Sequence, residues 1–91
     1  MFVTMVFHHP SPEHTADFAA FMRTIEEGMA GTDGLVSLES YRDTVNDQLV
    51  AIGRWESAEH AMAGVPKLMA IGGRDPSWTV RDDEVFQLQS L

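Results

Sequence analysis

The hydrophobic positions at the start of the chain follow the pattern of a buried strand. Residues 1–7 are apolar on both alternating faces, apart from Thr4. A strand exposed on one face would alternate apolar and polar residues, so this run predicts a central strand covered on both sides. His8-His9-Pro10 ends it, because proline lacks an amide donor and restricts the residue before it.

After Pro10 the apolar residues recur at the spacing of a helix. Ser11 is a suitable N-cap, Pro12 suits the first helical position, and Glu13 lies at the positive end of the helix dipole. Glycine at position 31 or 34 then provides a left-handed cap. The apolar stripe between these ends predicts one buried helix face: Phe18, Phe21, Met22, Ile25 and Met29.

The second half of the chain predicts a hairpin, a helix and a last strand. Residues 35–42 and 48–55 are strand-like, and the turn-forming residues 43–47 predict a loop of about five residues between them. A helix is expected after Ser57, and Pro66 is expected to bend or end it. We interpret all four methionines at helical positions as core: Met22, Met29, Met62 and Met69. The last strand is expected within residues 78–91, most securely across residues 84–88, with Arg81-Asp82-Asp83-Glu84 as its solvated start.

The element order is therefore β-α-β-β-α-β over one domain, residues 1–91. The pattern Ser-x-Glu-His occurs twice, at Ser11–His14 and at Ser57–His60, each time between a strand and a helix. Two related βαβ halves would produce this repeat. The fold class expected is α+β, a ferredoxin-like sandwich with a four-stranded antiparallel sheet.

Such a fold packs both helices on one face of its sheet and leaves the other face bare. Here the central strands are apolar on both faces, with Met5 and Phe7 opposite Val6 in the first strand. Monomers seldom expose apolar patches of that size. We therefore expect a homodimer through the sheet face; an ordinary two-layer monomer is the alternative.

Composition narrows the class of protein. The chain has 14 acidic and 6 basic residues, a formal charge of −8, which disfavours nucleic acid and anionic membranes as partners. It has no cysteine, which excludes disulfides and thiolate chemistry, and no apolar run as long as a membrane span. A cytoplasmic location is expected. The chain lacks nucleotide and flavin motifs, so no cofactor is predicted.

Two segments carry a resemblance to a known family. The second strand opens with Gly34-Leu35-Val36-Ser37-Leu38, and the third ends with Gly53-Arg54-Trp55-Glu56-Ser57-Ala58-Glu59-His60. Together with the element order, over residues 2–90, they resemble the antibiotic biosynthesis monooxygenase (ABM) family of dimeric α+β barrels. The Trp-Glu-Ser-x-Glu segment is the most specific part. Members include cofactor-independent oxygenases of aromatic polyketides and haem-degrading oxygenases.

The sequence departs from both activities. Haem-degrading members use an asparagine on the first strand with a tryptophan and a histidine on the second helix. In this chain the first strand has no asparagine, Gly64 and its neighbours are not tryptophan, and no histidine follows His60, so haem degradation of that type is not expected. The polyketide oxygenases have a tryptophan matched by Trp55, but Ala51 and Ala61 lie where their asparagine and tyrosine would be. The resemblance therefore implies only part of that site.

A pocket is predicted from the hairpin register. If Tyr41 lies opposite Leu49, then Ser37, Glu39 and Tyr41 share a sheet face with small residues and Trp55, with space for a ligand near Ser37, Ala51 and Gly53. A one-residue slip would combine the strand faces differently. The alternative is that helix side chains fill this space. Substrate-binding candidates are Tyr41, Ser37, Glu39 and Arg74, the last in the glycine-containing loop at 72–76; surface pairing is the alternative for Arg74.

The histidines supply the remaining chemistry. Adjacent histidines on a strand point to opposite faces, so no metal site is predicted. His14 and His60 lie at helix N-termini, where the dipole favours the neutral ring that a general base requires. The catalytic candidates are His60, His8 and Trp55, with capping as the alternative role for a helix-terminal histidine.

Two functions remain open. The first is a cofactor-independent monooxygenase acting on a small aromatic or carbonyl-rich metabolite, in a dry pocket where the substrate itself activates dioxygen. The second is a noncatalytic small-ligand-binding or interaction module on the same scaffold. An isomerase or lyase of small lactones is a further possibility on this fold.

Overall fold

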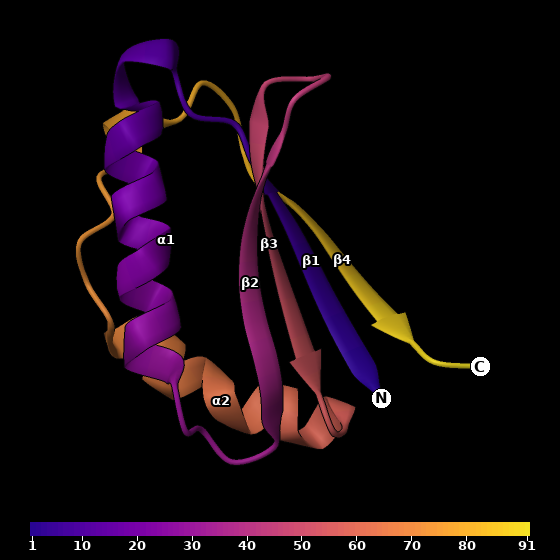
Figure 1. Cartoon of the computed structure of the whole chain (residues 1–91). Coiled ribbons are helices and arrows are strands. Elements are labelled where there is room, and N and C mark those ends of the chain that lie inside the picture. The colour runs from indigo at the N-terminus through magenta and orange to yellow at the C-terminus, as the bar shows by residue number, and fades with distance from the viewer.

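The computed structural model describes residues 1–91 and has the predicted order of elements. Figure 1 shows them, and their bounds are β1 (Phe2–His8), η1 (Pro12–His14), α1 (Thr15–Met29), β2 (Leu35–Asp43), β3 (Gln48–Trp55), α2 (Ala58–Ala70), η2 (Pro76–Trp78) and β4 (Glu84–Gln89). The two η elements are single 3-10 turns.

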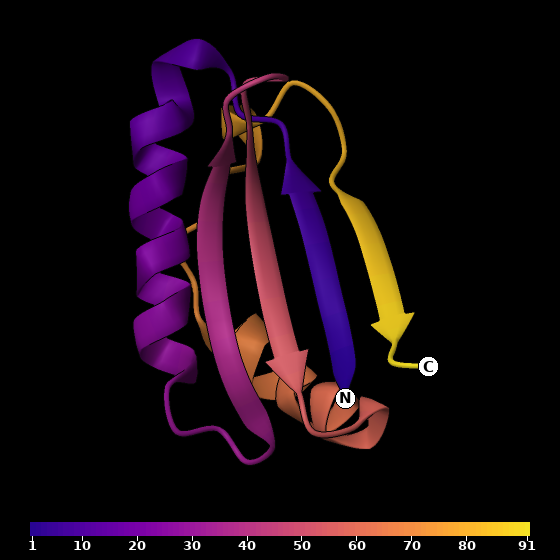
Figure 2. The ribbon, with the colours of Figure 1, turned by 45° about the vertical axis from the view of Figure 1, so that its right-hand side comes forward.

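The strands form one antiparallel sheet in the order β2-β3-β1-β4 (Figure 2). This confirms the ferredoxin-like α+β fold. Figure 1 shows the sheet almost edge-on, with α1 along one face, α2 crossing near one end of the strands, and nothing over the opposite face. We call these the helix face and the open face. Neither helix is both long and apolar enough to span a bilayer.

The core lies between the helices and the helix face, and it is small. Only 12 of the 91 residues are buried, so two helices leave much of the apolar surface uncovered. One cluster is formed by Phe18, Met22 and Leu49, and a second by Met29, Trp55 and Ala61. The strand β4 is exposed along its whole length. The central strands were predicted to be covered on both faces. In one copy of the chain only the helix face is covered.

The hairpin register differs from the prediction by one residue. Tyr41 pairs with Val50 rather than Leu49, because the strands extend to an Asp43–Gln48 pair and leave a four-residue turn. The Asp43 carboxylate closes that turn by accepting hydrogen bonds from the backbone N–H groups of Val45 and Asn46. The slip places Ser37, Glu39 and Tyr41 on the open face, away from Ala51, Gly53 and Trp55. The pocket expected between these two sets does not form.

The first helix starts and ends differently from the second. Ser11 makes no side-chain cap, and a 3-10 turn precedes α1, whereas Ser57 caps α2 by accepting from the His60 N–H at 3.1 Å. Of the two copies of the Ser-x-Glu-His pattern, only the second, at Ser57–His60, therefore caps a helix. Gly31 and Gly34 have φ of 78° and 79°, which confirms the left-handed conformation at both.

The second helix corrects two expectations. It continues past Pro66 to Ala70, so of the two outcomes expected for this proline, to bend or to end the helix, the second is wrong. Met62 and Met69 are 74% and 76% exposed, because Ala61 and Gly64 are the residues that α2 packs against the sheet. The small side chains let the helix approach Trp55 closely and turn its methionines outward. Met22 and Met29 are buried as predicted.

Candidate functional site

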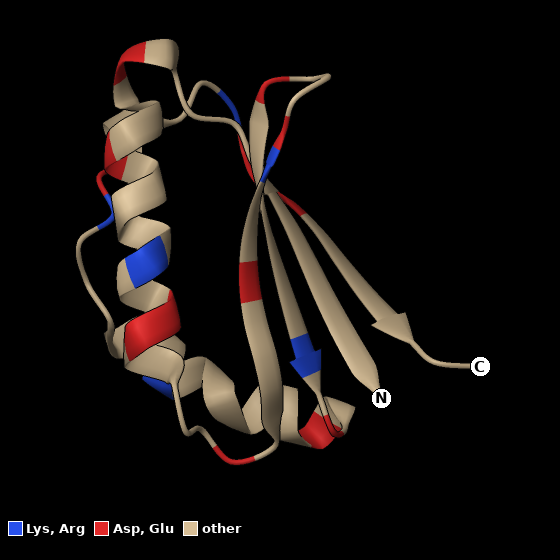
Figure 3. Ribbon diagram, in the orientation of Figure 1, with Lys and Arg blue, Asp and Glu red and all other residues tan.

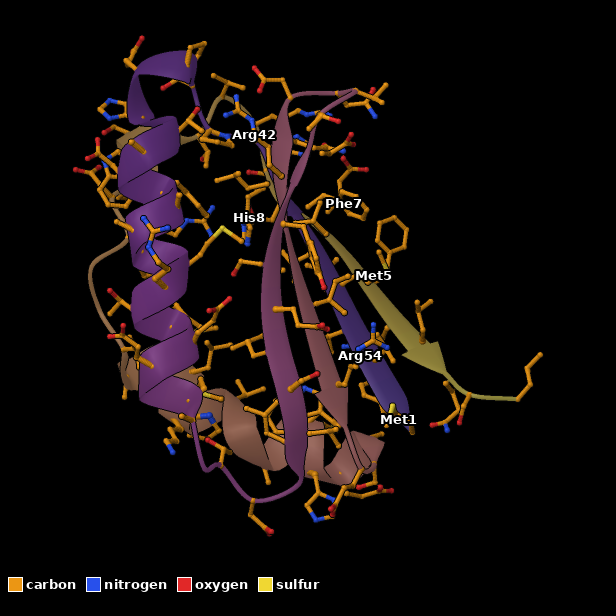
Figure 4. The ribbon with its side chains drawn as sticks, in the orientation of Figure 1. Met1, Met5, Phe7, His8, Arg42 and Arg54 are labelled. Carbon is orange, nitrogen blue, oxygen red and sulfur yellow. The ribbon has the colours of Figure 1, made fainter.

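The chemistry of the helix face gathers around His8, the last residue of β1. Figure 4 shows His8 on the side of the sheet that faces α1, whereas Met5 and Phe7 point to the open side. The His8 ring lies 4.6 Å from the Phe18 ring of α1, centroid to centroid, and His8 is 8% exposed. The end of β1 is covered by α1, so the His8 imidazole has little contact with solvent.

A carboxylate and a guanidinium complete this cluster. Asp83 Oδ1 lies 3.1 Å from His8 Nδ1, but it is off the direction of the ring N–H, so Nδ1 is close to the charge without an aligned hydrogen bond. Arg74 donates two hydrogen bonds to Asp83, at 2.7 and 2.9 Å. Its guanidinium carbon also lies 5.0 Å from the Phe18 ring centroid, a cation–π contact. We call His8, Asp83 and Arg74 the histidine cluster.

Burial decides the protonation state of His8. Loss of solvation lowers the pKa of His8 below its ordinary value, and the neighbouring Asp83 carboxylate offsets this only in part. For Asp83, burial would raise the pKa, but the hydrogen bonds from Arg74 and the proximity of His8 together hold it below its ordinary value. At neutral pH the arrangement therefore pairs a neutral imidazole with an ionised carboxylate, the combination that a general base needs.

A second histidine–carboxylate pair lies beside the first. His9 Nε2 is 2.9 Å from Glu84 Oε1, and the Val80 N–H donates to the His9 carbonyl at 2.9 Å. These contacts fasten the end of β1 to the start of β4. Asp83 lies between Val80 and Glu84 in the chain, so these two contacts with His9 fix its position.

An aromatic cleft of about 310 Å³ opens beside the histidine cluster, on one flank of α1. Phe21 and Trp78 form its apolar walls, and Gly72 and Gly73, just before Arg74, form its rim. Phe18 packs edge-on against both aromatic rings, so it separates the cleft from His8. Trp78 is placed here by the 3-10 turn η2, whose N-cap Asp75 accepts from the Ser77 N–H. The cleft is lined by Asp17, Ala20, Phe21, Thr24, Gly72, Gly73 and Trp78.

The other two catalytic candidates lie at the opposite end of the sheet. Trp55 pairs with Phe2, at the far end of β1 from His8, and it is buried against Met29 and Ala61. His60 Nδ1 is 2.6 Å from the hydroxyl of the capping residue Ser57, and its ring covers Gly34. Asp33 and Glu56 come no closer than 3.8 Å to Nε2. The structure thus gives Trp55 a place in the core and His60 a place in the cap of α2, and it does not bring either to His8.

The polar candidates on β2 form a network on the open face. Glu39 accepts from the Tyr41 hydroxyl and from Arg54 Nε, both at 3.0 Å. The Arg54 hydrogen bond is the main reason that the pKa of Glu39 is below its ordinary value, and the hydrogen bond to Glu39 raises the pKa of Tyr41. Ser37 lies on the same face, next to Arg54 in the register. The predicted substrate-binding residues are thus divided, with Arg74 alone on the side of His8.

Sequence reasoning missed Asp83. Asp83 was expected in a solvated strand start, yet its side chain is only 20% exposed. The signal that would have found it is topological, since β4 runs antiparallel to β1 and its first residues must meet His8. No three histidine, aspartate or glutamate side chains converge in a way that would hold a metal ion.

Comparison with known proteins identifies the fold. No family model matches the chain, and no curated protein matches it by sequence. Among solved structures, Rv0793 from Mycobacterium tuberculosis superposes with a TM-score of 0.85 at 18% identity, over 99% of this chain and 94% of that one. A Nitrosomonas europaea protein assigned to the antibiotic biosynthesis monooxygenases gives 0.84 at 14% identity, over 100% and 99%.

The same fold occurs in a haem-degrading protein. MhuD (Rv3592) from Mycobacterium tuberculosis, whose structure holds two haems in its active site, superposes with a TM-score of 0.80 at 12% identity, over 100% of this chain and 96% of that one. At these identities the comparisons establish a shared architecture. The chain has the monooxygenase-like ferredoxin fold that the sequence predicted.

Proposed function

We propose that this chain, which has the fold of the antibiotic biosynthesis monooxygenases, is a cofactor-independent oxygenase of a small aromatic or carbonyl-rich metabolite. The observation that carries the proposal is the buried, neutral His8 beside the ionised Asp83. An electron-rich hydroxyarene becomes reactive toward dioxygen once its hydroxyl proton is removed. His8 is the group that removes it, and the walls formed by Phe21 and Trp78 suit a flat ring.

The proposed reaction balances without an added reductant. His8 Nε2 takes the hydroxyl proton, and the resulting phenolate transfers one electron to dioxygen. The two radicals join at the para carbon to give a peroxide. The O–O bond breaks as that carbon loses its hydrogen, and the outer oxygen leaves as water with that hydrogen and the proton returned by His8. A hydroxyarene and dioxygen thus become a quinone and water, and the substrate supplies all four electrons. Asp83 and Arg74 act as positioning residues that hold His8 and its charge after protonation.

Access to His8 requires a side chain to move. Phe18 is 0% exposed, whereas the Arg74 side chain is 34% exposed and lies against both the Phe18 ring and Asp83. Displacement of Arg74, from a loop that contains two glycines, would open a path from the aromatic cleft to His8. The closed position of His8 supports a second candidate function, the binding of a small ligand in the cleft without turnover.

We further infer that two copies pair through the open face. Few positions of the four strands are Lys, Arg, Asp or Glu (Figure 3). Phe86 and Leu88 of β4 are 46% and 45% exposed. A second copy, sheet against sheet, buries them and leaves the helix-face site of each copy accessible.

Oxygen uptake separates the two candidate functions. The purified chain is incubated with 1-naphthol and related phenols, without flavin or metal, and uptake and quinone formation are recorded. His8→Gln is expected to lower kcat/KM by about 100-fold or more, the usual contribution of a general base. Lys67→Gln, which alters an exposed side chain of α2 that lines neither the cleft nor the histidine cluster, is expected to leave the rate unchanged.

Fluorescence gives the other outcome. Saturable quenching of Trp78, absent in Trp78→Phe and retained when Trp55 is replaced by phenylalanine, with no oxygen uptake across the panel, would establish binding without turnover. Turnover that is equal in the wild type and His8→Gln would refute the assignment of the base. Turnover without oxygen would indicate an isomerase or lyase instead.

A further inference from the structure

A second cleft lies on the flank of α1 opposite to the aromatic cleft. It has a volume of about 530 Å³, which is within the range of small-molecule sites. One wall is α1 and the other is the β2–β3 hairpin. The lining residues are Pro12, Thr15, Ala16, Ala19, Met22, Arg23, Ser40, Tyr41, Arg42, Asp47 and Leu49.

The charge of this cleft is opposite to that of the chain. Arg23, Arg42 and Asp47 are its only charged lining residues, a sum of +1 in a chain of −8. Asp47 is already paired with Arg42 at 2.6 Å. Arg23 has no carboxylate oxygen within 4.0 Å, although the chain has 14 acidic residues and its other four arginines are each paired. An unpaired guanidinium thus stands beside the cavity.

The hydroxyl groups of the cleft are all committed elsewhere. Thr15 donates to the Ser11 carbonyl and Ser40 donates to Glu26 at 2.5 Å, while the Tyr41 hydroxyl lies on the open face and donates to Glu39 there. The side-chain donors left for a ligand are therefore guanidinium N–H groups, which match a carboxylate best. Glu26, one turn from Arg23, does not line the cleft, and its carboxylate accepts the hydrogen bond from the Ser40 hydroxyl.

The floor of the cleft is apolar. Met22 and Leu49 are 5% and 6% exposed, and Ala19 and Ala16 keep the helix wall low. A ligand that places a ring on this floor and an anionic group at Arg23 satisfies both parts. The floor also borders the histidine cluster, because Leu49 pairs with His8 across β1 and β3.

We propose that this second cleft binds a small organic anion, a carboxylate on an apolar ring, through Arg23. The proposal does not depend on the oxygenase reaction, because the cleft is on the opposite flank of α1 from Phe21 and Trp78. Arg42 has a lesser role, since its charge is already balanced by Asp47.

The test is a binding titration with benzoate, followed by isothermal calorimetry and by amide shifts in an NMR spectrum. Benzoate is expected to shift residues of α1 and the hairpin, and benzamide and benzylamine are expected to bind at least 10-fold more weakly. Arg23→Gln is expected to raise the Kd for benzoate by about 10-fold or more, the scale of a charge-assisted hydrogen bond. Lys67→Gln, which removes one positive charge from α2, is the matched control and is expected to leave the Kd unchanged.

Two results would overturn the proposal. One is equal affinity for benzoate and benzamide, and the other is an unchanged benzoate Kd in Arg23→Gln. A His8→Gln variant that still binds benzoate, whatever its oxygen uptake, shows that the cleft is separate from the proposed reaction. Loss of benzoate binding in His8→Gln with its fold intact would contradict that separation.

Discussion

At the scale of single residues, burial and charge compete at His8. The ring is packed against Phe18, which favours the neutral form, while Asp83 favours the charged form. Burial prevails, so the pKa of His8 is below its ordinary value of 6.5. The same competition has the opposite result at Asp83, because Arg74 contributes two charge-assisted hydrogen bonds there.

The lowered pKa of His8 makes folding stability depend on pH in a definite direction. The unfolded chain binds a proton at this histidine before the folded chain does, so the contribution of His8 is complete above pH 6.5 and is lost as the pH falls below it. Urea unfolding at pH 7.5 and pH 5.5 is expected to show a smaller loss in His8→Gln than in the wild type. An equal loss in both proteins would contradict the direction assigned to this pKa.

Asp43 offers a test in the acid range. Hydrogen bonds from the Asn46 and Gln48 side chains, and from backbone N–H groups of the turn, lower its pKa to about 2 from 3.8. Because the unfolded chain is protonated first, the stabilisation is complete above about pH 4 and is lost as the pH falls toward 2. Asp43→Ala is expected to lower the unfolding midpoint at pH 7, with the gap to the wild type narrowing between pH 4 and pH 2. Asp82→Ala, at an exposed position, is the control and is expected to leave the midpoint unchanged.

At the scale of elements, the approach of α2 to the sheet depends on a missing side chain. A Cβ atom on Gly64 would lie 2.6 Å from Cη2 of Trp55, a ring held in the core by Met29 and Ala61. A Cβ on Gly28 of α1 would also meet an atom at 2.6 Å, but that atom is the far end of the flexible Ile71 side chain. The two helical glycines therefore differ in what their neighbours can do.

Alanine substitution at these two glycines is expected to have different outcomes. In an unhindered helix, glycine to alanine gains about 1 kcal/mol, and overpacking a core costs about 1–3 kcal/mol. Gly64→Ala is expected to destabilise the chain, because the Trp55 ring has no room to move. Gly28→Ala is expected to be neutral or stabilising. Chemical denaturation of both variants measures the difference, and a stabilised Gly64→Ala would show that α2 can shift away from the sheet.

At the scale of the whole molecule, one copy leaves two apolar surfaces uncovered. One is the open face of the sheet, which includes Phe86 and Leu88, and the other is the outer side of α2 with Met62 and Met69. The open face is continuous across β3, β1 and β4, whereas the α2 surface is a single narrow stripe. We therefore assign the proposed dimer contact to the open face.

Two matched substitutions test that assignment. Phe86→Asp places a charge on the open face and is expected to convert a dimer into a monomer with the 10.1 kDa mass of the chain. Met69→Asp places the same charge on α2 and is expected to leave the dimer intact. Light scattering at micromolar concentration measures both. A wild-type chain that is monomeric, or a dimer that is lost only in Met69→Asp, would refute the assignment.

The amino-acid sequence by itself determined the elements and their order, because strand and helix periods are local properties of the pattern. The strand at residues 1–7, the helix that carries the stripe from Phe18 to Met29 and the left-handed glycines at 31 and 34 were predicted correctly in this way, although only Phe18, Met22 and Met29 of the stripe are buried. The Ser57 cap and the ferredoxin-like topology were also predictable, since both follow from neighbouring residues or from few connection rules. The dimer, the single domain and the functional roles of the candidate residues remain predictions.

Only the tertiary structure decided which of these residues meet. The hairpin register depends on one turn residue, Asp43, and a slip of one position moved Tyr41 and Glu39 to the opposite face from Trp55. The outward direction of Met62 depends on how closely Gly64 lets α2 approach Trp55. Asp83 reaches His8 across 75 positions of the chain because β4 pairs with β1. Such contacts join residues that are far apart in the sequence, so the local pattern of hydrophobic and polar residues does not predict them.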